Sequence, residues 1–94
     1  MVTEPELDVL EVLRAAADRG ERMHGWEVVE TVRRSGATVH RVLDQLEHAG
    51  RLVAEWDAAA SGRDRRRWYT LTPDGLAWAV EVLTRFRTSL NQRP

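Results

Sequence analysis

A very short break between two helical stretches limits what this chain can fold into more than any other feature. Apolar residues recur every three or four positions from Gly25 to Arg34 and again from Thr38 to Ala49, as the buried face of an α-helix requires. Ser35 and Gly36 interrupt the pattern between them, and both residue types favour turns. The two helices must therefore be joined by a tight turn and pack close to each other.

A further helix is predicted before this pair and a β-hairpin after it. Pro5 to Arg19 repeats apolar residues at helical spacing, with Thr3 as the predicted N-cap and Gly20 as the stop. Leu52 to Trp56 and Arg66 to Leu71 are rich in β-branched and aromatic residues and flank a loop that contains Ala, Ser and Gly. These two runs predict a two-stranded hairpin with an arginine-bearing tip.

The last helix is predicted to begin at Thr72, Pro73 and Asp74 and to run to about Leu90. The three starting residues supply an N-cap, a proline in the first turn and an acidic group near the positive end of the helix dipole. The apolar residues form two stripes, namely Leu76, Ala79, Val80, Leu83 and Leu90, and Trp78, Val82 and Phe86. One small core does not need so wide an apolar surface, so we expect this helix to contact a second partner.

The composition excludes several classes of protein. A chain of 94 residues provides one small domain, and its lack of cysteine excludes disulfides, thiolate nucleophiles and cysteine zinc sites. Three scattered histidines do not predict a metal site, and the sequence has no glycine-rich phosphate loop or Ser/His/Asp arrangement. No apolar run approaches the roughly 20 residues that span a bilayer, and the acidic start is unlike a signal peptide. We expect a soluble cytoplasmic protein with no membrane contact, no cofactor, no metal and no enzymatic activity.

This order of elements predicts a mainly α protein with a small β-hairpin, the winged helix-turn-helix fold. In that fold the third helix enters the major groove of DNA, and the hairpin, or wing, touches the flanking backbone. We expect residues 1–72 to form the DNA-binding domain and residues 73–91 to form a C-terminal helix of the same compact unit.

The charge distribution favours local contact with DNA over coating by bulk charge. The net charge is only −1, but residues 33–68 hold eight basic and five acidic side chains, whereas residues 1–32 hold three and eight. Every basic residue is arginine, which suits bidentate contact with phosphate or guanine, although biased codon usage would produce the same pattern. Overall usage does not explain the density of the cluster Arg63, Arg65, Arg66 and Arg67.

Four motifs follow one another along this framework. They are HGWE at 24–27, SGATVHRVLDQL at 35–46, EHAGRLV at 47–53 and RRRWYTLTPDG at 65–75. In this order they resemble the motifs HGYE, SGTLY, LExxGLV and RRxYxLT followed by PxG of the PadR family of bacterial transcriptional regulators. The similarity covers about residues 7–85, with His40 in place of the family's tyrosine and Ala37 as an additional residue. The ordered combination is much more specific than any single motif.

The resemblance implies a DNA-binding regulator of transcription, which we expect to be a homodimeric repressor acting on an inverted repeat. It also implies the compact class of the family, in which the single C-terminal helix dimerises by packing against the partner's N-terminal helix. The residues expected at that interface are Leu7, Leu10, Leu76, Trp78, Val80, Val82, Leu83 and Phe86. Two recognition helices related by a twofold axis would meet half-sites about 10 base pairs apart.

Two groups of side chains are candidates for contact with double-stranded DNA. Thr38, Arg41 and Gln45 share the exposed face of the third helix, where arginine suits guanine or phosphate and glutamine suits adenine or phosphate. Together with the turn and the wing, the candidate set is Ser35, Thr38, His40, Arg41, Gln45, Arg63, Arg65, Arg66 and Arg67. Strand alternation puts Arg65 and Arg67 on one face and Arg66 on the other, so the wing arginines cannot all reach DNA. The alternatives are an ordinary polar helix face and a solvated hairpin.

Charged neighbours of these candidates have alternatives that the sequence leaves open. His40 is either a phosphate donor that makes binding pH-dependent or a tolerated surface residue. Asp44 and Glu47 would repel phosphate, so we expect them to face the helix flank or to pair with Arg41 and Arg51.

The aromatic residues have a packing interpretation and a ligand-binding one. Trp78, Val82 and Phe86 could line a cavity for a small hydrophobic or aromatic effector at the dimer interface. Aromatic side chains on a helix more often pack in a core or an interface. Packing is also the expected role of Trp26, Trp56 and Trp68.

The alternative from a different functional class is a winged-helix module that docks a partner protein and binds DNA weakly or not at all. The net charge of −1 gives this alternative weak support. The response to salt separates the two, because phosphate binding weakens by orders of magnitude between low and physiological salt, whereas apolar docking hardly changes.

Overall fold

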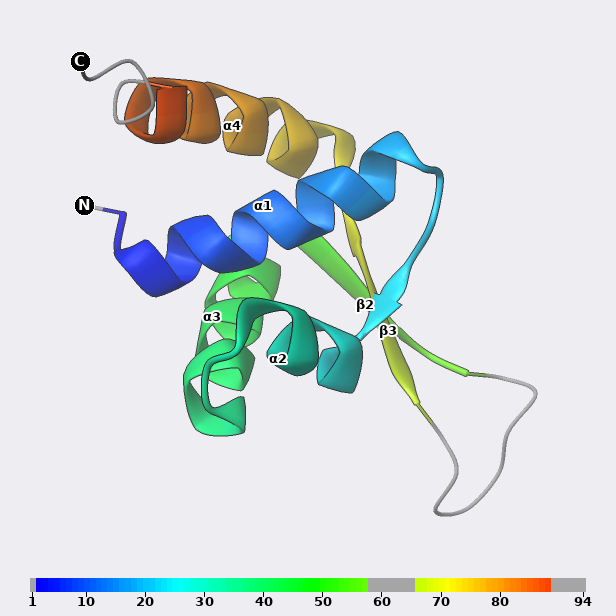
Figure 1. Ribbon diagram of the computed structural model, residues 1–94. Helices are drawn as coiled ribbons and strands as arrows, with labels where there is room; N and C mark the ends of the chain where they lie inside the picture. Colours follow the sequence, from blue (N-terminus) through cyan, green and yellow to red (C-terminus); the bar gives the residue numbers. More distant parts are fainter. Residues whose placement is uncertain (1, 58–65, 89–94) are drawn as a thin grey trace.

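The computed structural model describes residues 2–57 and 66–88 and has the predicted winged helix-turn-helix architecture (Figure 1). Within these residues, four α-helices pack together and a small antiparallel sheet extends away from them. The elements are α1 Glu4–Asp18, β1 Met23–His24, α2 Gly25–Val32, α3 Gly36–His48, β2 Leu52–Trp56, β3 Arg67–Leu71, α4 Pro73–Leu83 and the π-helical segment η2 Thr84–Thr88. The expected fold class, mainly helical with a small β component, is confirmed.

Side-chain caps fix where the helices begin. The hydroxyl oxygens of Thr3 and Thr72 accept hydrogen bonds from backbone N–H groups in the first turns of α1 and α4, as predicted. Ser35 caps α3 in the same way, because its hydroxyl oxygen accepts from the N–H of Thr38 at 3.2 Å. The helix therefore begins at Gly36, two residues before the predicted start, and the turn residue is also a helix cap.

The turn between α2 and α3 depends on its surroundings. α2 ends at Val32, earlier than predicted, and Arg33 follows in the left-handed conformation with a φ of 58°. A residue with a side chain loses roughly 1–2 kcal/mol in that conformation. Val28 and Val29 are buried in the core, and their burial holds α2 in place despite this turn.

The apolar face of α1 forms the centre of the core. Val9 and Leu10 have no exposed surface, and α1 packs against α2, α3, α4 and β3. Val28 of α2, Leu43 of α3 and Ala79 of α4 are equally inaccessible and belong to the same cluster. Full burial of one large aliphatic side chain contributes roughly 2 kcal/mol, so helices that are marginal alone become stable together.

The predicted two-stranded hairpin is confirmed, and it belongs to a sheet with a third strand that was not predicted. β3 lies in the middle and pairs antiparallel with β2, in register from Leu52 and Leu71 to Trp56 and Arg67. The other edge of β3 pairs with β1, a strand of two residues. A strand this short has no alternating pattern, so only its pairing partner reveals it. This pairing ties the chain before α2 to the base of the wing.

The C-terminal helix changes character before its predicted end. Regular α-helix ends at Leu83, and the chain continues as the π-helical segment η2. The predicted end near Leu90 lies outside the described residues. α4 lies alongside α1 (Figure 1). Neither α4 nor any other helix in the described part of the chain is long and apolar enough to cross a membrane.

A carboxylate on α1 connects distant parts of the fold. Asp8 accepts one hydrogen bond from Arg34 Nε at 2.7 Å and another from Arg87 of η2. Burial raises the pKa of Asp8, but the hydrogen bonds and positive charges of the two arginines outweigh it and hold this pKa below its ordinary value of 3.8. The start of the turn to α3 and the C-terminal segment are therefore anchored to the same side chain.

The Gly75→Ala substitution tests the tightest backbone contact. A Cβ atom at this position would lie 1.9 Å from the carbonyl oxygen of Arg51, so the backbone would have to move. We expect the free energy of unfolding, measured by urea denaturation, to fall by about 3 kcal/mol. The control is Gly36→Ala, because nothing lies within 4 Å of a Cβ there. Equal stability of the two variants would contradict the contact.

The Asp8→Asn substitution should lower the free energy of unfolding by about 1–2 kcal/mol at neutral pH. Because the pKa of Asp8 is depressed in the folded state, its contribution is present above 3.8 and is lost as the pH falls through the folded value. Urea titrations should therefore show the two proteins converging below about pH 4. Glu81→Gln, which removes an exposed pair with Arg85, is the control and should change stability little. A difference that stays constant down to low pH would contradict the role of Asp8.

Candidate nucleic-acid interface

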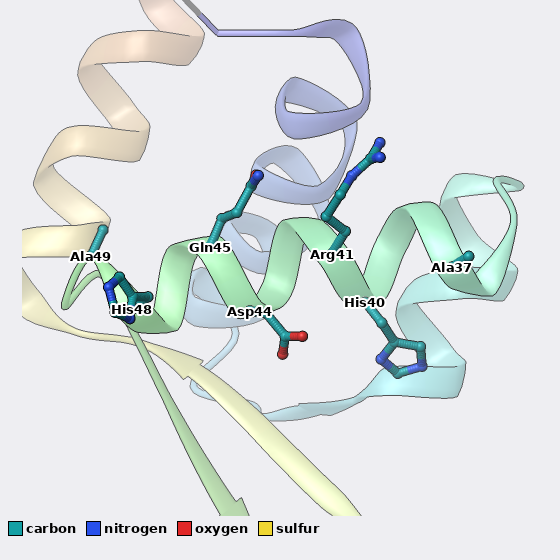
Figure 2. A pocket seen from close by; sticks show the side chains of 7 residues that line it. All are labelled: Ala37, His40, Arg41, Asp44, Gln45, His48 and Ala49. Atoms are coloured by element: carbon teal, nitrogen blue, oxygen red, sulfur yellow. The ribbon is translucent and has the colours of Figure 1, made fainter.

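The outer face of α3 forms a broad open groove of about 640 Å³. Two rows of side chains four residues apart flank it, as neighbouring ridges do on a helix surface. One row holds Ala37, Arg41, Gln45 and Ala49, and the other holds His40, Asp44 and His48. Arg41 and Gln45 point to one side of the helix, whereas His40 and Asp44 point to the other (Figure 2). One rigid element and its C-cap therefore present the whole groove.

The buried face of α3 fixes the orientation of this groove. The core side chains of α3 are Val39, Val42, Leu43 and Leu46. Because side chains follow each other by about 100° around a helix, burial of this face turns the groove residues outward. Arg41 and Gln45 are exposed as predicted, whereas Thr38 is half-buried.

Arg41 and Gln45 are available to bind a ligand. Neither side chain makes a hydrogen bond or ion pair with another described residue, and the expected pair between Arg41 and Asp44 does not form. The hydroxyl groups of Ser35 and Thr38 are partly occupied, because Ser35 donates a hydrogen bond to Thr38 at 2.9 Å. Among the side chains of α3 that were predicted to contact DNA, Arg41 and Gln45 in the middle turns therefore keep their polar groups unpaired.

Arg67, one of the predicted phosphate contacts, is paired with a carboxylate of the protein itself. Its Nη2 atom donates to both carboxylate oxygens of Glu47, at 3.1 and 2.9 Å, and its guanidinium lies near the rings of Trp56 and Tyr69. Of the two alternatives for Glu47, facing the helix flank or pairing with Arg51, the pairing does not form. The alternation of side-chain direction along a strand could not reveal this pair, because α3 and β3 are brought together only by folding.

Arg66 is the exposed arginine at the described base of the wing. Its backbone carbonyl accepts a hydrogen bond from the N–H of Asp57 at 2.8 Å, which continues the pairing of β2 with β3 by one residue on each strand. The predicted phosphate contacts at Arg63 and Arg65 lie outside the described residues. Of the four wing arginines, the structure therefore describes one exposed side chain and one paired side chain.

The start of α2 meets α3 and the wing at a small cleft of about 210 Å³. The ring of His40 lies so close to Gly25 that a Cβ atom there would be 2.9 Å from His40 Cε1. Trp26 lines this cleft and is 61 % exposed, and Trp56 on β2 is 53 % exposed. Trp26 and Trp56, expected to be packing residues, are therefore largely exposed, whereas Trp68 is half-buried against His24.

The phenol of Tyr69 lies buried behind this surface. Burial raises its pKa, the charge of Arg67 opposes the rise, and the carboxylates of Asp44 and Glu47 add to it. The hydroxyl therefore stays protonated at neutral pH, and Tyr69 joins β3 to the helical core.

Half of the predicted dimer-interface residues are enclosed in the chain's own core. The buried ones are Leu7, Leu10, Val82 and Leu83. Leu76, Trp78 and Val80 are half-buried, and Phe86 is exposed. The guanidinium of Arg51 lies 3.7 Å above the ring of Trp78. The apolar stripes of the C-terminal helix did not show which side chains would pack against α1 and which would remain accessible to a partner.

The described residues contain no group of three or more histidine, aspartate and glutamate side chains placed to hold a metal ion. The candidate functional features of this part of the chain are the groove on α3, the base of the wing and the remaining apolar surface of α4 and η2.

The motifs, the fold and the exposed helix agree with one family. The sequence profile of the Transcriptional regulator PadR-like family matches residues 9–79. The chain belongs to this family. The resemblance carried by the four motifs is thereby confirmed, and the PadR-like family and fold are those of transcriptional regulators. No curated protein matches the chain significantly.

Solved structures share the PadR-like fold. The PadR family transcriptional regulator from Eggerthella lenta superposes with a TM-score of 0.70 at 25% identity, over 88% of this chain and 74% of that one. BpsR from Bordetella bronchiseptica, whose DNA binding is regulated by 6-hydroxynicotinic acid, superposes with a TM-score of 0.74 at 28% identity. The match covers 97% of this chain and 63% of BpsR. MepR from Staphylococcus aureus, in its complex with DNA, superposes with a TM-score of 0.73 at 24% identity and shares the fold. The match covers 97% of this chain and 68% of MepR.

The pair formed by Glu47 and Arg67 should stabilise the PadR-like fold by about 1 kcal/mol, because both side chains are half-buried and the contact is bidentate. A double-mutant cycle with Glu47→Gln and Arg67→Ala, measured by urea denaturation, gives this coupling energy. The matched cycle at Glu81 and Arg85 should give a value near zero, since that pair is exposed. Strictly additive effects at Glu47 and Arg67 would contradict the pair.

Proposed function

We propose that this PadR-like protein is a homodimeric repressor that binds an inverted repeat in DNA through α3 and the wing. The observation that carries the proposal is the exposed pair Arg41 and Gln45, which have no partner among the described residues. Arginine can bind guanine or phosphate, and glutamine can bind adenine or phosphate. A single helix of this kind fits a major groove about 12 Å wide.

The wing supplies phosphate contacts in this proposal. Arg66 is exposed beside β3, and Arg63 and Arg65 belong to the same basic run but lie outside the described residues. Further contacts are proposed for the first turn of α3, at Ser35, Thr38 and His40. Phosphate contacts set the position of α3, and contacts to base edges give the selectivity.

Dimerisation is proposed to use the apolar surface that α4 and η2 leave accessible. Its residues are Leu76, Trp78, Val80 and Phe86. The buried members of the expected interface support this surface from below. A twofold axis through it would present two copies of α3 to half-sites about 10 base pairs apart, which accounts for an inverted repeat.

A small hydrophobic or aromatic molecule is proposed to release the protein from DNA. BpsR, a structurally similar protein, has its DNA binding regulated by 6-hydroxynicotinic acid, which supports this step. Trp78 and Phe86 offer aromatic surface, although an effector on Trp78 would have to displace the guanidinium of Arg51. Val82 is buried, so it would contribute only from beneath. As a regulator of bacterial genes, the protein would act in the cytoplasm.

Fluorescence anisotropy across a salt series tests DNA binding. Labelled duplex from upstream of the protein's own gene should bind more tightly than unrelated duplex, and both should weaken steeply with salt. Arg41→Ala should weaken binding by roughly 10-fold, because it removes one base or phosphate contact. Arg66→Ala should lower the salt slope by about 0.9, because one phosphate is no longer neutralised.

The matched control for these variants is Arg85→Ala, which removes the same charge from η2, outside the proposed DNA contacts, and should leave both quantities unchanged. Weak binding that is equal for both duplexes and insensitive to salt would favour a docking module for a partner protein instead. DNA binding with an unaffected Arg41→Ala variant would remove α3 from the interface.

Sedimentation velocity tests the dimer. The wild-type protein should sediment as a dimer, and Phe86→Asp should sediment as a monomer, because a charge on the exposed apolar surface opposes its burial. Thr84→Asp places the same charge on an exposed neighbour in η2 and should stay dimeric. A monomeric wild-type protein, or a dimeric Phe86→Asp variant, would contradict the proposed interface.

A further inference from the structure

Asp44 places a negative charge in the middle of the surface that would face DNA. Its side chain is exposed and lines the groove on α3, in the same row as His40 and His48. A carboxylate in this place repels phosphate whatever the DNA sequence, so it lowers general affinity. Only a group that donates hydrogen bonds can offset this repulsion.

The carboxylate of Asp44 has no such donor within the described protein, although its neighbours do. Glu47, three residues along α3, binds Arg67, and Glu27 on α2 accepts a hydrogen bond from the backbone N–H of His24. Asp44 makes no hydrogen bond or ion pair with any described residue. The guanidinium of Arg41 points to the other side of the helix (Figure 2). Both oxygens of Asp44 therefore keep their full capacity to accept hydrogen bonds from a ligand.

Base amino groups are the donors that a helix meets in the major groove. Cytosine presents its N4 amino group there and adenine its N6 amino group, whereas guanine presents two acceptors and thymine an acceptor and a methyl group. Adenine also presents the acceptor N7 beside N6, which would face the second carboxylate oxygen. Cytosine is therefore the base that a carboxylate matches best.

We propose that Asp44 accepts a hydrogen bond from the N4 amino group of a cytosine and so determines one base pair of the recognised half-site. This inference rests on the proposed DNA-binding function and adds to it the chemistry of one position. The carboxylate lowers affinity for all DNA, but it lowers affinity most for a duplex that presents acceptors at that position. This difference selects the duplex that carries the cytosine.

Selection from a pool of randomised duplex DNA tests the inference. The wild-type protein should select a C·G pair at one fixed position of each half-site. Asp44→Asn keeps the shape but gains a donor, and an asparagine pairs with both N6 and N7 of adenine, so that position should change from cytosine to adenine. Asp44→Ala should lose the preference there, with a discrimination of roughly 10-fold falling to about 1. The other positions should keep their preferences.

Anisotropy titrations with the selected duplex and its single-base variants measure this discrimination. Asp74→Asn is the matched control, because it makes the same change in net charge at an exposed position in the first turn of α4. It should select the same sequence as the wild-type protein.

Two outcomes would overturn the inference and are distinguishable. If both Asp44 variants bind every duplex more tightly by one factor and select the wild-type sequence, Asp44 acts by repulsion alone, and DNA binding itself stands. If the wild-type protein binds no duplex in a salt-dependent manner, the proposed function fails and the inference fails with it.

Discussion

Burial of the apolar face of α1 is the interaction on which the rest of this structure depends. Val9 and Leu10 are inaccessible to solvent, and α1 packs against α2, α3, α4 and β3. None of the described helices exceeds 15 residues, and helices of that length are marginal on their own in water. Their order therefore comes from a shared core, which sets the direction of α3 and, through β3, the base of the wing. The orientation of the groove on α3, the proposed DNA-binding surface, is thus a consequence of how one helix is buried.

Ion pairs at the margin of this core decide which charges a ligand can use. Asp8 binds arginines from the turn before α3 and from η2, and Glu47 binds Arg67 at the base of the wing. These pairs join segments that are far apart in sequence, so they add to the positioning of α3. Arg41 and Asp44, exposed on α3, lack such partners among the described residues. The groove therefore keeps unpaired charges, as a surface for polar recognition requires.

The PadR-like fold divides its apolar surface between internal and external use. Val82 and Leu83 of α4 cover the core beside α1, whereas Leu76 is half-buried and Phe86 of η2 is exposed. In a domain this small, a core buries only about 60–65 % of the surface of the unfolded chain, so association with a second copy is a natural source of further stability. The change from α-helix to π-helix after Leu83 falls between Val80 and Phe86, within this accessible surface.

The helices, the hairpin and the family could be predicted from the sequence, because these depend on local periodicity, caps and motif order that the chain carries along its length. Thr3 and Thr72 predicted helix starts, and the exposure of Arg41 followed from the burial of the opposite face. Tertiary structure decided the rest. Strand β1 exists only through pairing with β3, and the pair between Arg67 and Glu47 forms only because folding brings β3 to α3. Contacts between residues 20 or more positions apart leave no local pattern, so only the folded chain shows which charges are paired and which remain free.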